Sequence, residues 1–192
     1  MLRTNGAESG EPPGDLAMWI FILAELSVFA IFFAAYAFAR QGNEALFRQY
    51  QATLDRGAAL VNTLALLLAS YLVARAVQAI QAGQARHCAR WLWAAVAMGG
   101  VFVVVKLHEY GVHLGHGVSL STNTFYMFYL SLTFFHFMHV ILGMVILGAV
   151  AVKARAGAYD ALAHQGVETG ASYWHMVDMV WLLLFPLVYV MQ

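Results

Sequence analysis

The chain has 192 residues, of which 62% are hydrophobic and only 10% carry a charge, and its formal net charge is zero. Soluble domains contain about 25% charged residues, so this composition excludes a soluble globular protein, whose surface would need more polar side chains. The zero net charge argues against a nucleic-acid partner. Cys88 is the only cysteine, which excludes an intrachain disulfide. The composition therefore predicts an integral membrane protein.

Long apolar segments predict an all-α bundle of five transmembrane helices, because about 20 apolar residues are enough to cross a bilayer. Residues 1–15 form a polar cytoplasmic N-terminal tail, and one transmembrane domain occupies residues 16–192. The five spans are expected at about 16–39, 57–80, 90–112, 122–152 and 171–191. No segment alternates with the period of two that barrel strands require. Pro186 is expected to kink the last span.

The basic residues predict how the chain is oriented. Five spans place the two termini on opposite sides of the membrane. The N-terminal side holds Arg3, Arg75, Arg86, Arg90, Lys153 and Arg155. The opposite side holds Arg40, Arg48 and Arg56. The positive-inside rule therefore predicts a multi-pass membrane protein with its N-terminus in the cytoplasm and its C-terminus on the outer side.

Ionisable side chains inside the apolar spans are the candidate functional residues, because each costs at least about 2.5–3.5 kcal/mol in lipid. The set consists of Glu25 in the first span, His136 and His139 in the fourth, and Glu168, His175 and Asp178 at the start of the fifth. A buried hydrogen-bond network between helices is the leading interpretation. A proton-relay or proton-loading role of the same network is the second.

Lys106 and Glu109 lie three residues apart near the outer end of the third span. Side chains at this spacing meet on one helix face. The default interpretation is a local outer-side ion pair that offsets the cost of both charges, and a role at a partner interface is the alternative.

Other residues are expected to have structural roles. Aromatic belts at the membrane surfaces are expected to include Trp19, Trp91, Trp93, Tyr126 and Tyr129. Helix–helix contacts are expected at Asn62, Ser70, Gly99, Gly100, Gly143 and Gly148.

A metal site is the third interpretation of the intramembrane residues. Three histidines with two carboxylates are compatible with non-haem iron or zinc. However, the HxxH spacing of His136 and His139 brings only two ligands, and neither a Glu-x-x-His pair nor HExxH occurs. No CxxCH haem-attachment motif is present. The residues therefore predict no catalytic, cofactor-binding or metal-binding side chain on this chain.

Five segments, in order, resemble subunit III of the haem–copper oxidases. They are residues 18–25 with Glu25, Asn62-Thr63 with residues 66–70, Glu109-Tyr110, residues 133–143 with His136 and His139, and residues 168–181 with Glu168, Tyr173-Trp174-His175, Val177-Asp178 and Trp181. Subunit III commonly has seven helices, and the five expected here resemble its last five. Residues 132–139 are most similar to the short branch of nitric oxide reductase accessory (NorE-type) proteins.

This resemblance implies a non-redox accessory membrane subunit that docks on the catalytic subunit of a haem–copper oxidase or nitric oxide reductase. It would support assembly, stability or sustained turnover in respiration or denitrification. The resemblance also implies no redox cofactor on this chain, haem with copper or non-haem iron in the partner subunit, and bound lipid. The alternatives are a stand-alone transporter or proton channel, and then a small membrane metalloenzyme. The paired broken helices typical of transporters are not seen.

Overall fold

A computed structural model describes residues 16–191, so the predicted tail at 1–15 lies outside the described residues. The elements are α1 (Leu16–Gln41), α2 (Glu44–Gln51), α3 (Arg56–Gln81), α4 (Ala85–Gly115), α5 (Thr124–Arg155), α6 (Gln165–Phe185) and the π-helix η1 (Pro186–Val190). Five helices, α1, α3, α4, α5 and α6 continued by η1, are long and apolar enough to cross a membrane. The all-α bundle of five transmembrane helices is confirmed.

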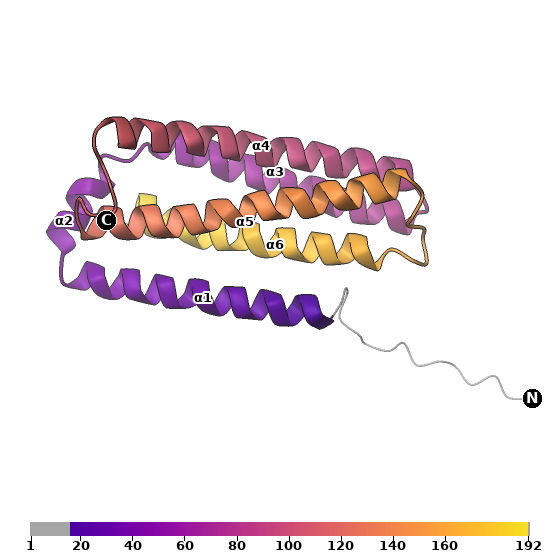
Figure 1. Cartoon of the computed structure of the whole chain (residues 1–192), viewed down its shortest axis with the longest axis horizontal. Helices are drawn as coiled ribbons and strands as arrows, with labels where there is room; N and C mark the ends of the chain where they lie inside the picture. Colours follow the sequence, from indigo (N-terminus) through magenta and orange to yellow (C-terminus); the bar gives the residue numbers. More distant parts are fainter. Residues whose placement is uncertain (1–15, 192) are drawn as a thin grey trace, which may run out of the picture.

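Helices α3 to α6 form a four-helix bundle, and α1 lies along one side of it against α5 and α6 (Figure 1). The buried residues of α1 are Ile22, Phe29 and Tyr36, which repeat every seven residues. Residues seven positions apart lie two helical turns apart on the same face, so the buried residues form one narrow stripe. Most of the α1 surface therefore faces away from the bundle. The start of α1 and the end of η1 lie at opposite ends of the molecule (Figure 1).

Several helices run beyond the apolar segments that predict them. Helix α6 begins at Gln165, six residues before the expected start at 171, and α4 begins at Ala85 rather than at 90. Hydropathy marks where the lipid-compatible segment ends, whereas backbone hydrogen bonding continues the helix into the polar zone. Three helices end just before glycines with positive φ, namely Gly83, Gly117 and Gly157, the usual helix stop signal.

The packing of α4, α5 and α6 depends on two glycines that face Trp174. A Cβ on Gly99 would lie 3.0 Å from the Trp174 ring, and one on Gly143 would lie 2.9 Å from it. These two expected helix contacts are confirmed. By contrast, a Cβ on Gly100 would meet nothing within 4 Å, and one on Gly148 would approach only Trp93, at 3.9 Å. The fully buried Trp174 side chain therefore packs against two of these four glycines, Gly99 and Gly143.

The C-terminal end of the bundle is held by the short loop helix α2. Regular α-helical structure ends at Phe185, and Pro186 begins the π-helix. Carbonyl groups at a helix end lack intrahelical partners. The buried Gln51 side chain of α2 donates through Nε2 to the Val188 carbonyl at 2.8 Å. This bond ties the first loop to η1 and fixes the position of Tyr189.

Candidate functional site: ionic contacts within the bundle

Glu25 of α1 and His139 of α5 form a direct contact in the middle of the membrane domain. His139 Nε2 lies 2.9 Å from Glu25 Oε2, and His139 Nδ1 lies 2.7 Å from the Phe135 carbonyl. A carbonyl only accepts, so Nδ1 must carry a hydrogen. One further proton is then shared between Nε2 and Glu25. The pair is satisfied either as imidazolium with carboxylate or as neutral imidazole with carboxylic acid.

This pair is open to the surroundings of the bundle. The Glu25 side chain is 20% exposed and that of His139 is 10% exposed. Both line a groove of about 470 Å³, whose other walls are Met138, Ile141, Leu142 and Val145. The pair therefore lies at the surface of the bundle and not inside its core.

His136 does not join this pair, although it lies only one turn away on α5. Its side chain is fully buried, and neither ring nitrogen has a hydrogen-bond partner among residues 16–191. It sits among aromatic rings, with centroids 5.2 Å from Trp181, 5.6 Å from Phe102 and 6.4 Å from Phe29. The two histidines of the HxxH pattern therefore have different surroundings, and His136 behaves as part of the aromatic core.

The remaining predicted residues form two further contacts on α6. Glu168 Oε1 lies 3.2 Å from Nε2 of His164, a residue that the sequence interpretation missed although it precedes Glu168 by one helical turn. His175 Nδ1 lies 3.4 Å from Asp178 Oδ2, and the His175 side chain is 45% exposed. Among residues 16–191, no hydrogen bond or ion pair joins these contacts to Glu25–His139. The single predicted network is thus divided into three separate contacts.

The predicted Lys106–Glu109 ion pair is present, with 2.9 Å between Nζ and Oε2. Both side chains are enclosed within the bundle, because that of Lys106 is 0% exposed and that of Glu109 is 5% exposed. Glu109 Oε1 also accepts hydrogen bonds from the hydroxyls of Tyr129 and Tyr189. Lys106 Nζ in turn donates to Tyr189. The pair is a closed unit that joins α4, α5 and η1.

Aromatic rings complete the enclosure of Lys106. Its ammonium lies 5.1 Å from the ring centroids of Tyr110 and Tyr129, 5.3 Å from that of Tyr189 and 5.8 Å from that of Trp181. Ring faces attract a cation at such distances. The sequence interpretation placed Tyr129 in a surface aromatic belt, which is wrong because Tyr129 is fully buried. The available signal was Lys106 itself, since a lysine inside a span needs several polar partners.

No group of three or more histidine, cysteine, aspartate and glutamate side chains within residues 16–191 is arranged to hold a metal ion. What the described contacts can do chemically is hold protons and fix helices. Glu25–His139 shares a proton beside a groove, and Lys106–Glu109 locks three elements together.

Comparison with known proteins decides the family. The family model described as cytochrome c oxidase subunit III matches residues 13–192, almost the whole chain. This chain belongs to the cytochrome c oxidase subunit III family. The resemblance carried by the five sequence segments is thereby confirmed, and with five apolar helices the chain is a multi-pass membrane protein.

Individual relatives agree with this assignment. "Cytochrome c oxidase subunit 3" of Thermostichus vulcanus is 34% identical over 177 residues, 92% of this chain and 86% of that protein. The protein of the same name from Synechocystis is 33% identical over 181 residues, 92% of this chain and 76% of that one. "Probable quinol oxidase subunit 3" of Staphylococcus aureus (strain USA300) is 25% identical over 189 residues, 97% and 94% of the two chains. The nitric oxide reductase branch stays a prediction.

Proposed function

We propose that this chain is a non-redox accessory subunit that docks on the catalytic subunit of a haem–copper oxidase and supports its assembly, stability or sustained turnover. The family match over residues 13–192 carries this proposal. Its relatives are named as third subunits of cytochrome c and quinol oxidases, names that imply an assembly. In this proposal the partner holds the haem, together with copper or non-haem iron, and lipid fills the space around the helices.

The experiment is purification of the tagged chain from native membranes in a mild detergent. We expect a haem-containing membrane protein to be recovered with it, seen as a haem absorption band in the eluate. Assays of oxygen and nitric oxide consumption then separate an oxidase partner from a nitric oxide reductase. A tagged multi-pass protein of another family is the control. Recovery of the chain with no haem-containing partner would contradict the proposal.

Within this function, the Glu25–His139 pair is proposed to hold and release protons for the partner. The support is geometric: two groups that share one proton lie 2.9 Å apart at the edge of a groove. Histidine changes its charge near neutral pH. Glu25→Gln is expected to slow partner turnover or to alter its pH profile, while Glu44→Gln, in the loop helix α2, provides a matched control. Unchanged turnover at every pH leaves only a structural role for the pair.

The orientation is also a proposal. Arg75, Arg86, Arg90, Lys153 and Arg155 all belong to the end of the bundle where α1 begins. By the positive-inside rule this end faces the cytoplasm and residue 191 faces the periplasm of a bacterial inner membrane. Alkaline phosphatase fused after the C-terminus should be active and a green fluorescent protein fusion dark. The reverse pattern would invert the assignment.

A further inference from the structure

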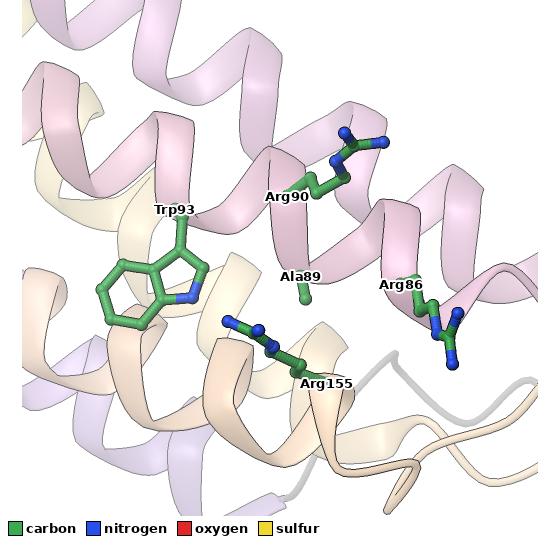
Figure 2. Close-up of a pocket in the computed structure, with 5 residues that line it drawn as sticks. All are labelled: Arg86, Ala89, Arg90, Trp93 and Arg155. Carbon is green, nitrogen blue, oxygen red and sulfur yellow. The ribbon is translucent and has the colours of Figure 1, made fainter.

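A groove of about 520 Å³ lies at the end of the bundle where α4 begins and α5 ends, and no residue of the ion pairs within residues 16–191 lines it. Its lining residues are Arg86, Ala89, Arg90, Trp93 and Arg155 (Figure 2). Three of the ten lysine and arginine residues of the chain therefore line one hollow. None of the interpretations of the intramembrane residues makes use of them.

Small residues create this hollow. Ala89 is 3% exposed and offers only a methyl group as the floor of the groove. One turn further along α4, Trp93 lies over Gly148 of α5, where an added Cβ would be 3.9 Å from the indole ring. In Figure 2 the Arg155 side chain reaches from α5 past Ala89 toward Trp93, whereas the side chains of Arg86 and Arg90 extend from α4 away from Arg155. The two helices thus present cations around an unfilled space.

No carboxylate among residues 16–191 pairs with the arginines of this groove, Arg86, Arg90 and Arg155. The first turn of α4 contains no acidic residue, and its N-cap residue Gln84 makes no side-chain capping bond. The N-terminal end of a helix carries partial positive charge. Arg86 and Arg90 are like charges four residues apart, which repel. An anion in the groove would offset this repulsion and the positive charge at the start of α4.

The place of the groove indicates the kind of anion. It lies at the first three turns of α4 and the last turn of α5, where transmembrane helices leave the apolar core. Phosphate groups of lipids are concentrated at this depth, and a half-exposed tryptophan such as Trp93, 44% exposed, is typical of it. Guanidinium groups match phosphate oxygens with two parallel hydrogen bonds.

We propose that the groove between α4 and α5 is a binding site for a phosphate group, held by Arg155 and Arg86 with Arg90 adding to the positive potential. The phosphate belongs either to an anionic phospholipid, whose acyl chains would run beside Trp93, or to free phosphate in solution. Binding there would clamp the start of α4 to the end of α5. This role does not depend on the Glu25–His139 pair or on the nature of the partner subunit.

The test uses the full-length chain in nanodiscs of phosphatidylcholine, with short-chain phosphatidylglycerol or inorganic phosphate added in separate arms. Native mass spectrometry counts the bound lipid, and thermal unfolding reports stabilisation by either probe. Each arginine near an anionic surface contributes enough to change the affinity about fivefold. We expect Arg155→Gln and Arg86→Gln each to weaken binding by about that factor, and the double variant to abolish it.

Arg75→Gln is the matched control, because Arg75 lies near the same end of the bundle but stacks over Trp91 at 5.7 Å outside the groove. Selective loss of phosphatidylglycerol binding in the groove variants supports a lipid phosphate. Selective loss of the response to inorganic phosphate supports a soluble one. If neither probe binds, or if the groove variants bind as the wild type and Arg75→Gln do, the proposal is overturned.

Discussion

Two of the ion pairs within the bundle have the same length but different surroundings. Lys106–Glu109 and Glu25–His139 both measure 2.9 Å. The first lies within one helix, is sealed by four aromatic rings and accepts two tyrosine hydroxyls. The second joins two helices that are far apart in sequence and lies at the edge of a groove. The sealed pair is shielded by its own chain, whereas the open pair stays accessible from the groove.

The largest expected effect follows from breaking the sealed pair. Lys106→Met leaves the Glu109 carboxylate buried without its cation, which costs about 3–5 kcal/mol of stability. The double variant Lys106→Met/Glu109→Gln removes both charges and keeps an acceptor for Tyr129 and Tyr189, so it should recover much of that loss. Thermal unfolding in detergent measures both. A single variant as stable as the double would show that the charges are not coupled.

A smaller effect is expected where α5 and α6 pack beside the open pair. Gly143→Ala places a methyl group 2.9 Å from the Trp174 ring, and overpacking of this kind costs about 1–3 kcal/mol. Gly148→Ala is the control, since its methyl group meets only Trp93 at 3.9 Å. That change should be neutral, or stabilising by up to about 1 kcal/mol through helix propensity. Equal unfolding temperatures for the two variants would refute the close contact.

The two histidines of the HxxH pattern give a third comparison. His139→Phe removes the partner of Glu25, and leaving a half-buried carboxyl group unpaired costs about 1–3 kcal/mol. His136→Phe replaces a ring that already sits among aromatic rings, so stability should change by less than about 1 kcal/mol. Unfolding in detergent distinguishes them. The opposite order of stabilities would mean that His136, and not His139, carries the essential hydrogen bonds.

The smallest effect concerns a group outside the membrane-spanning segments. Asp160, in the loop between α5 and α6, accepts hydrogen bonds from the backbone N–H groups of Leu162 and Ala163, which lower the pKa of its carboxyl group. A lowered pKa in the folded state adds stability above the ordinary value of about 4, which is lost as the pH falls through the lowered value. Asp160→Asn should therefore remove this group's contribution to the pH dependence of the free energy of unfolding, and only below about pH 4. A changed pH dependence near pH 7 in this variant would contradict the assignment.

Much of the local structure was predictable from the sequence. The apolar runs gave the five spans, and the spacing of Lys106 and Glu109 gave their ion pair. The pairing of Glu25 with His139 was not predictable, because the two residues are 114 positions apart and any of three histidines could have met the carboxylate. The enclosure of Lys106 was missed for the same reason, since Tyr189 approaches it from the far end of the chain.

The sequence by itself determined that this chain spans the membrane five times and that its charges inside the lipid must be few and paired, because hydropathy and the cost of a buried charge act on each segment separately. Only the tertiary structure decided which charges of different helices meet, and that one pair is sealed while the other stays open. The physical reason is packing: small residues such as Gly99 and Gly143 set how closely the helices approach, and that approach selects the partners.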